Sequence, residues 1–204
     1  MITIRPVAAA DLDACYEIAL KTGDAGKDAT ALHSDPKLIG HLYVAPYAVL
    51  EPRLAMVAVD DEGVAGYLVG VTDTLAFQAR LAREWWPELQ AQYAPPAGEG
   101  APWTAADTAY IHQIRHPERA QPEVVAHYPA HMHMNLLPRL RRQGVGTRLM
   151  QAWREAAGDA GRKTHVGVSR TNPGGRAFWE SQGFRELIYP SLAETGALWM
   201  GADW

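Results

Sequence analysis

The sequence predicts an α/β fold in which helices flank a mixed central sheet of about six to seven strands. Two observations lead to this prediction. Segments rich in β-forming residues alternate with amphipathic helical segments along the 204 residues. A strand that ends near Leu137 also runs through a glycine-bearing loop straight into a helix, and α/β folds bind ligands at such a strand end. This length is typical of one domain, so we expect residues 1–204 to form a single domain.

The first half of the chain predicts strands and helices in turn. Residues 2–7 alternate as a strand does, and residues 10–21 form a helix capped by Asp11, because their apolar side chains share one face. Acidic residues and a glycine at 60–63 separate two β-prone runs, which indicates a hairpin. The other elements expected here are a polar loop over 22–34, a helix over 36–49 that is interrupted by Pro46, and hairpin strands over 54–59 and 64–71.

Residues 74–128 form a predicted insertion before the central strand. Its expected parts are a helix over 76–93, a loop over 94–102 and a short strand over 109–114. A segment that shapes a substrate pocket and a purely structural lid fit this sequence equally well. After the central strand, the pattern predicts a helix over 146–160, a strand over 164–169, a helix over 175–182, and strands over 184–189 and 196–200.

Charge and cysteine content exclude several classes of protein. The net charge of −4 argues against a general nucleic-acid-binding protein, yet basic residues gather between Arg139 and Arg176. Local basicity in a mildly acidic chain fits a small polyanionic ligand, although a solvated helix face accounts for some of these residues. Cys15 is the only cysteine, which predicts no internal disulfide and a cytoplasmic protein. The sequence shows neither a signal peptide nor an apolar run of the roughly 20 residues that span a membrane.

The loop after the central strand carries the pattern Arg141-x-x-Gly144-x-Gly146. A glycine-bearing loop at a helix start leaves several backbone N–H groups pointing one way, and such a concavity binds phosphate. A mononucleotide P-loop requires Gly-Lys-Ser/Thr, and a dinucleotide loop requires a third small residue where this chain has Leu149. The remaining interpretations are another kind of phosphate loop and an ordinary strand–turn–helix.

The loop pattern resembles the pyrophosphate loop of the GNAT acyltransferases, which bind acetyl-coenzyme A. A second motif agrees: Asn172, Trp179 and the pair Gly183-Phe184 occupy the places of the family's asparagine, its aromatic residue seven positions on, and its Gly-Phe pair. The resemblance covers residues 130–185 closely and the first 72 more loosely. It implies a GNAT fold with a helical insertion before the cofactor-binding strand. The chain is most similar to the acetyltransferase-like domain of O-GlcNAc hydrolases and its freestanding bacterial relatives, in which cofactor binding and catalysis do not always occur together.

The resemblance implies acetyl-CoA as co-substrate and no metal. The loop N–H groups would hold the pyrophosphate, the end of the strand would pair with the pantetheine arm, and the Asn172 amide would bind that arm. Arg176 fits a phosphate contact and a solvated helix position equally well. The expected cofactor-binding residues are Leu136, Leu137, Arg141, Arg142, Gln143, Gly144, Val145, Gly146, Thr147, Asn172, Arg176 and Trp179.

The candidate catalytic residues are His133, His131 and Asn135. The two histidines share one face of the strand, and a near-neutral pKa suits a general base. Arylalkylamine acetyltransferases carry a similar His-x-His one residue out of step with this one, and such a slip reverses the face of a strand. Half-buried structural histidines and a zinc site are the alternatives, but the sequence shows no suitably spaced third ligand. Further candidates, if the insertion folds over the cleft, are His112, Tyr110 and Asp107.

Trp179 departs from the family, which often has a tyrosine there to protonate the leaving thiolate. An indole N–H donates a hydrogen bond but cannot deliver its proton at neutral pH. Hydroxyls that could replace it belong to Tyr110, Tyr128 and Tyr189. We therefore expect an N-acetyltransferase acting on an amine by direct attack, with an inactive acetyl-CoA-binding or partner-binding module as the alternative. A nucleotide-binding protein of another fold is a further alternative, and the family resemblance allows a homodimer.

Overall fold

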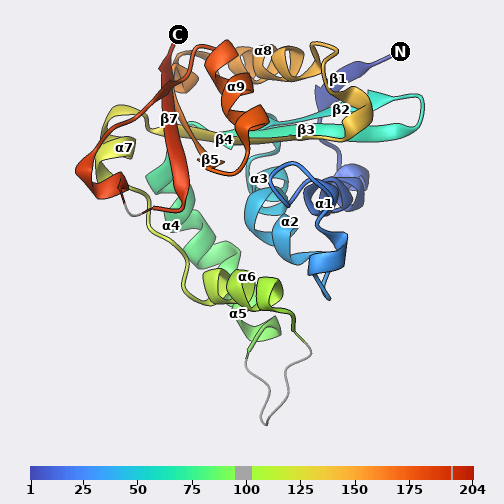
Figure 1. Ribbon diagram of the computed structural model, residues 1–204, viewed down its shortest axis with the longest axis vertical. Helices are drawn as coiled ribbons and strands as arrows, with labels where there is room; N and C mark the ends of the chain where they lie inside the picture. The colour runs from blue at the N-terminus through green and yellow to red at the C-terminus, as the bar shows by residue number, and fades with distance from the viewer. Residues whose placement is uncertain (95–102, 194) are drawn as a thin grey trace.

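The computed structural model describes residues 1–94, 103–193 and 195–204. These residues form a seven-stranded sheet in the order β1-β2-β3-β4-β5-β7-β6. Helices α8 and α9 cover one face of the sheet, and α1, α2 and α3 cover the other (Figure 1). The predicted mixed α/β sheet with flanking helices is confirmed.

The N-terminal half follows the predicted order of elements. The helix expected over 36–49 with an interruption at Pro46 is present as two helices, α2 and α3. Pro46 lies in the first turn of α3 and lacks the N–H that a continuous helix needs. The hairpin is present as expected. The elements of this half are β1 (Thr3–Pro6), α1 (Leu12–Lys21), α2 (Leu38–Tyr43), α3 (Ala45–Leu50), β2 (Ala55–Asp60) and β3 (Gly63–Val71).

The insertion is helical in the residues described, so the strand predicted over 109–114 was wrong. Thr104 caps a helix there: its hydroxyl accepts from the Asp107 N–H, and the Asp107 carboxylate accepts from the Thr104 N–H. Ile111 and Ile114 are buried on the same face of that helix. The loop predicted over 94–102 lies outside the described residues, apart from its first residue. The helices are α4 (Thr74–Glu84), α5 (Trp86–Gln92), α6 (Ala105–Arg115) and α7 (Pro122–His127).

The C-terminal half contains the central strand and the helix that follows it. The strand predicted over 184–189 is shortened to β6, which has two residues. The elements are β4 (Ala130–Leu136), α8 (Val145–Ala157), β5 (Lys163–Ser169), α9 (Pro173–Ser181), β6 (Arg185–Glu186) and β7 (Ala197–Asp203). Short 3-10 turns lie at Ala9–Asp11, Thr30–Leu32, Pro52–Leu54, Pro138–Leu140, Gly158–Gly161 and Pro190–Leu192.

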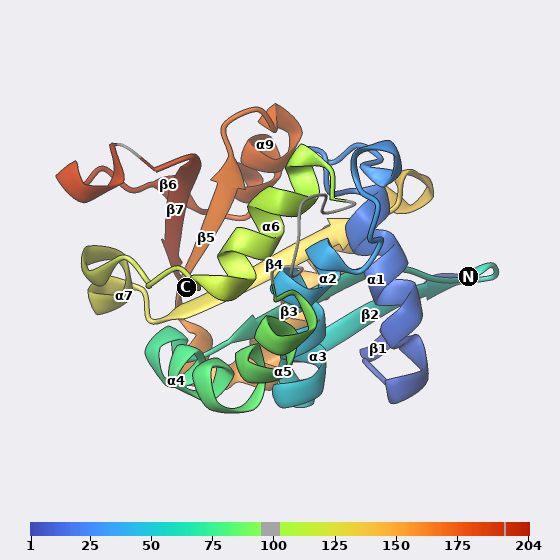
Figure 2. The same ribbon diagram turned by 90° about the horizontal axis from the view of Figure 1, so that it is seen from below.

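Strands β4 and β5 separate along their length. They form the parallel pair of the sheet and are joined only at Ala130↔Thr164 and His131↔His165, although each strand has seven residues. Both strands remain paired along their outer sides, β4 with β3 from His131 to Leu136 and β5 with β7 over its whole length. Figure 2 shows the two strands diverging toward their carboxyl ends. The sheet is therefore open at its centre beyond His131.

Each face of the sheet has its own core. On one face, residues of α1 to α6 pack against β2 and β3, and Tyr67 is among the largest fully buried side chains there. On the other, Trp153 of α8 and Phe184 lie fully buried against the sheet. Two cores with different partners hold the separated strands in place from both sides. Within the described residues, no helix is long and apolar enough to cross a membrane.

Candidate functional site

The open edge of β4 presents backbone groups with no strand beside them. The Leu137 N–H donates to the Ala65 carbonyl at 2.8 Å and so continues the β3–β4 ladder. Backbone groups of alternate residues point to the same side of a strand, so those of His133 and Asn135 also face β3. Those of Met134 and Leu136 face the opening. An extended ligand can pair with such an edge as an added strand would.

The predicted phosphate loop lies at the carboxyl end of this edge. Gly144 is the N-cap of α8 with a φ of 70°, and Arg142 also has a positive φ of 60°. The first N–H groups of a helix lack partners within the helix and carry its positive partial charge. The exposed residues of the loop include Arg141, Arg142, Gln143, Gly144 and Thr147, whereas Val145 and Gly146 are buried. The structure thus places the sequence-predicted loop and the open edge side by side.

Gly146 allows α8 to approach α9 closely. A Cβ at this position would lie 2.7 Å from Cε2 of Phe178, which is closer than packed carbon atoms come. The second glycine of the loop therefore serves helix packing. The first, Gly144, is needed for its backbone conformation. A Cβ there would meet nothing within 4 Å, but a residue with a side chain rarely adopts this positive φ.

The segment between α1 and α2 lies across the open end of β4 and β5. Arg141, just past β4, donates from Nη2 to the Gly26 carbonyl at 2.7 Å and from Nε to the Leu136 carbonyl at 2.9 Å. A Cβ on Gly26 would lie 3.8 Å from Nδ2 of Asn172, just past β5. Asn172 itself caps α9, its Oδ1 accepting from the Gly175 N–H at 2.8 Å. Gly26 thus approaches both strand ends.

Arg176 and Trp179 have partners within the chain. The Arg176 guanidinium pairs with Glu180 at 2.8 Å and with Glu186 at 3.3 Å, and its side chain is about half exposed. Trp179 is buried and packs edge-on against Phe184. A packing role accounts for the tryptophan, and ion pairs on the helix surface account for the arginine.

The face of β4 toward α1, α2 and α3 carries the candidate catalytic residues. Nδ1 of His131 lies 2.7 Å from Oγ1 of Thr74. Oη of Tyr47 lies 2.8 Å from Nε2 of His131 and 3.0 Å from Nε2 of His133. The predicted histidine pair therefore shares one hydroxyl. His133 is the first residue of this face beyond the last β4–β5 pair, so it lies where the strands begin to separate.

Asn135 is anchored by its side chain. Its Oδ1 accepts from the Tyr67 hydroxyl at 3.0 Å, and its Nδ2 donates to Oγ1 of Thr22 at 2.6 Å. Thr22 in turn donates to the Ile18 carbonyl at the end of α1. The amide therefore joins β4 to β3 and α1.

The histidines of this site are neutral at pH 7. Burial, together with nearby His165, lowers the pKa of His133 to about 4, and burial holds the pKa of His131 well below its usual range. Burial also lowers the pKa of His165 to about 4, although its hydrogen bond to the Tyr128 carbonyl acts in the opposite direction. Burial raises the pKa of Tyr47 far above its ordinary value, so its hydroxyl keeps its proton. Each neutral ring therefore carries a proton on one nitrogen and a lone pair that can accept a proton on the other.

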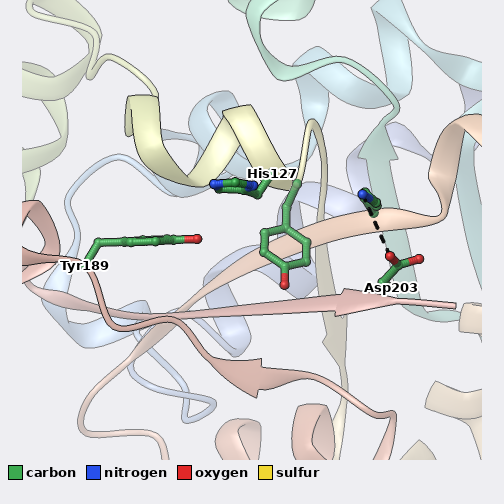
Figure 3. Close-up of a pocket in the computed structure, with 5 residues that line it drawn as sticks. His127, Tyr189 and Asp203 are labelled. Atoms are coloured by element: carbon green, nitrogen blue, oxygen red, sulfur yellow. Dashed lines mark ion pairs between the residues drawn. The ribbon is translucent and has the colours of Figure 1, made fainter.

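Of the other candidates, Tyr110 lies near the histidines, since its ring is edge-on to Tyr43, which is edge-on to His133. Asp107, Tyr128 and Tyr189 lie elsewhere. Asp107 is fully buried and pairs with Nδ1 of His33 at 2.8 Å, which ties the insertion to the segment between α1 and α2. Tyr128 and Tyr189 line a surface cavity of about 190 Å³ (Figure 3), in which the Tyr189 ring lies nearly parallel to that of His127. Lys163 and Asp203, which also line it, begin β5 and end β7. This cavity therefore lies at the opposite end of the parallel pair from the predicted phosphate loop.

Sequence reasoning did not identify Tyr47, Thr74, Met134 or Gly26. Strand alternation could have indicated Met134, since its backbone points away from β3 whenever that of His133 points toward it. No spacing signal exists for the other three, which come from distant segments. Among the described residues, no group of three or more His, Cys, Asp or Glu side chains is arranged to hold a metal ion.

Comparison with known proteins agrees with this arrangement. Residues 106–186 match the family model described as an acetyltransferase (GNAT) domain. The crystal structure of SsHAT superposes with a TM-score of 0.82 at 30% sequence identity, covering 99% of this chain and 98% of that one. The chain therefore shares the mixed α/β fold of that structure over nearly its whole length. The chain belongs to the GNAT acetyltransferase family.

Two further similarities are narrower. Rat protein O-GlcNAcase (Rattus norvegicus) is 31% identical over 97 residues, which are 48% of this chain and 10% of that much longer protein. The chain thus matches about a tenth of the length of that relative. Diaminobutyrate acetyltransferase EctA from Paenibacillus lautus, solved with its substrate and coenzyme A, superposes with a TM-score of 0.52 at 11% identity over 100% of this chain and 95% of that one. This second likeness shows the fold alone.

Proposed function

We propose that the chain is an N-acetyltransferase that binds acetyl-CoA in the opening between β4 and β5 and transfers the acetyl group to an amine. One observation carries this proposal: the edge of β4 that has no strand beside it leads to the N-terminus of α8. The edge suits an extended amide-bearing arm, and the helix start suits a pyrophosphate. Coenzyme A contains both parts in this order.

The proposed contacts follow from the backbone. Met134 and Leu136 pair with the pantetheine arm, while the loop N–H groups from Gln143 to Thr147 hold the pyrophosphate. Each hydrogen bond to a charged phosphate oxygen stabilises the complex by roughly 1.5–3 kcal/mol. The Leu137 N–H remains with Ala65, so the strand contributes its even-numbered residues to this contact.

In the proposed reaction, His133 takes one proton from the acceptor's ammonium group, which leaves the amine with a free electron pair. That pair attacks the thioester carbon, forming the C–N bond and breaking the C–S bond. The second amine proton passes to the departing thiolate, and His133 releases the first to solvent. A thiol with a pKa of about 8.5 leaves without strong assistance from an acid, so a tryptophan at 179 is compatible with turnover.

A binding module without turnover is the second candidate. The low pKa of His133 favours it, because a base with a pKa of about 4 has little driving force to remove a proton from an ammonium group. The buried Trp179 favours it too, since it supplies no exchangeable acid. Both candidates require acetyl-CoA binding at the same place, and they differ in turnover.

Two measurements test the proposal. Calorimetry with acetyl-CoA and with ATP checks the ligand, and we expect binding of acetyl-CoA in preference to ATP. Thioester loss measured over a panel of amines checks turnover in the wild type, His133→Gln and Trp179→Tyr. His127→Gln, which removes an exposed histidine from outside the site, is the matched control. Preference for ATP contradicts both candidates, whereas acetyl-CoA binding without turnover in every form supports the binding module.

A further inference from the structure

A chain of hydrogen bonds joins the histidine face of β4 to the start of α4. The Thr74 hydroxyl donates to the Pro129 carbonyl at 2.6 Å and contacts Nδ1 of His131 at 2.7 Å. Nε2 of His131 contacts the Tyr47 hydroxyl at 2.8 Å, and this hydroxyl contacts Nε2 of His133 at 3.0 Å. Four successive bonds therefore connect a backbone carbonyl to the proposed base.

The carbonyl end sets the direction of the chain. A carbonyl oxygen only accepts, so the hydrogen of the Thr74 hydroxyl must lie between Oγ1 and Pro129. With that hydrogen used, Oγ1 can only accept from Nδ1 of His131, which must carry a proton. Because His131 is neutral, its Nε2 holds a bare lone pair.

The same reasoning continues to His133. The Tyr47 hydroxyl must donate its one hydrogen to the bare Nε2 of His131, which leaves the oxygen to accept from Nε2 of His133. A neutral imidazole carries a proton on one nitrogen and a lone pair on the other. Since His133 has its proton on Nε2, its lone pair is on Nδ1, outside the chain of bonds.

We propose that Tyr47 and Thr74 are positioning residues that hold His133 in the Nε2–H tautomer, so that its Nδ1 lone pair is available to the acceptor amine. This inference rests on the proposed function, in which His133 is the base. The tautomer of His133 then depends on Thr74, which is three hydrogen bonds away. If the Thr74 hydroxyl is removed, His131 can place its proton on Nε2 and every bond of the chain can reverse its direction. His133 would then carry its proton on Nδ1.

The surroundings keep this chain ordered. Tyr47 is 6% exposed and lies on the Phe77 ring with their centroids 4.7 Å apart, and Thr74 is 4% exposed at the first turn of α4. The backbone N–H of Thr74 also donates to the Pro129 carbonyl, at 2.9 Å. The two positioning residues are thus fixed by packing and by backbone bonds.

The direct test is ¹⁵N NMR of the full chain, in which ring-nitrogen shifts distinguish the two tautomers of each histidine. The His133 signals are identified by their loss in His133→Gln. In the wild type we expect a proton on Nε2 of His133 and on Nδ1 of His131. In Thr74→Val we expect His133 to gain the Nδ1–H form, whereas Thr74→Ser, which keeps the hydroxyl, retains the wild-type tautomer.

Activity gives the second readout. General-base catalysis contributes roughly 10²–10⁴-fold, so partial loss of the correct tautomer should lower kcat about tenfold in Thr74→Val and in Tyr47→Phe, with little change in the KM for acetyl-CoA. Tyr43→Phe is the matched control. The Tyr43 ring lies edge-on to His133 at 5.5 Å, but its hydroxyl donates to Gln113 at 3.1 Å and lies outside the chain. This variant should retain the tautomer of His133.

The possible outcomes distinguish the positioning role of Tyr47 and Thr74 from the proposed acetyltransferase function. A wild-type His133 with its proton on Nδ1 overturns the direction of the chain, whatever the activity. A tautomer change in Thr74→Val without slower turnover overturns the positioning role but leaves the acetyltransferase proposal intact. Full turnover in His133→Gln contradicts the base role and therefore the positioning role, even if the tautomers are as expected.

Discussion

His165 should make the stability of the fold depend on pH. Its ring is 5% exposed, packed against His131 of β4 and Trp199 of β7, and its Nδ1 bonds to the Tyr128 carbonyl. The pKa of His165 falls from an ordinary 6.5 to about 4 in the fold. Between these values the unfolded chain binds a proton that the folded chain does not. The stabilisation is therefore present above pH 6.5 and is lost as the pH falls toward 4.

The magnitude follows from the two pKa values. A shift from 6.5 to 4 predicts that unfolding costs about 2 kcal/mol less at about pH 5 than at about pH 7.5 because of this one ring. His133, with its pKa near 4, contributes in the same direction. Replacing the buried His165 imidazole by an amide, which does not titrate, should remove the contribution of His165 to this pH dependence.

Urea unfolding at the two pH values measures this difference. We expect His165→Asn, whose amide can still donate to the Tyr128 carbonyl, to show a pH dependence smaller than that of the wild type by about 2 kcal/mol. His127→Asn removes an exposed histidine and should follow the wild type. Equal pH dependence in His165→Asn and the wild type would refute the assignment of a neutral, buried His165.

Three further results are expected. Gly146→Ala should destabilise the fold by about 1–3 kcal/mol in thermal unfolding, because its Cβ meets the Phe178 ring at 2.7 Å; a stability equal to the wild type would contradict the close packing of α8 and α9. Gly144→Ala should cost only about 1 kcal/mol, since it meets open space at a φ of 70°. Arg141→Ala should raise the Kd for coenzyme A roughly tenfold in calorimetry. It should also speed amide exchange near Gly26, because the Arg141 guanidinium donates to the Gly26 carbonyl in the wild type. Unchanged exchange near Gly26 would contradict this bridge between the two segments.

The glycine loop before α8 could be predicted because its information is local. A strand, two glycines and a helix start follow one another within a few residues, and the family's second motif lies about 25 residues further on. Backbone geometry at a helix N-terminus then follows from chain order alone. The positive φ of Gly144 and the start of α8 at Val145 agree with that pattern.

The strand predicted over 109–114 was wrong because residue composition was misleading there. Tyr110, Ile111 and Ile114 favour strands by composition, yet the capping box of Thr104 and Asp107 was present in the sequence five residues earlier. Burial of one helical face against α2 and α5 outweighed the preference of single residues. The capping box and the buried helical face together determine the helix at this segment.

The sequence by itself determined the family, the glycine loop before α8 and the presence of two histidines on one strand face. Only the tertiary structure decided what those histidines can do. Tyr47 and His133 are 86 positions apart and Thr74 and His131 are 57 apart, so no local pattern relates them. Packing of α3 and α4 beneath the sheet brings these hydroxyls to the imidazoles. Because a hydroxyl has one hydrogen to give, that packing determines which ring nitrogen of each histidine holds its proton.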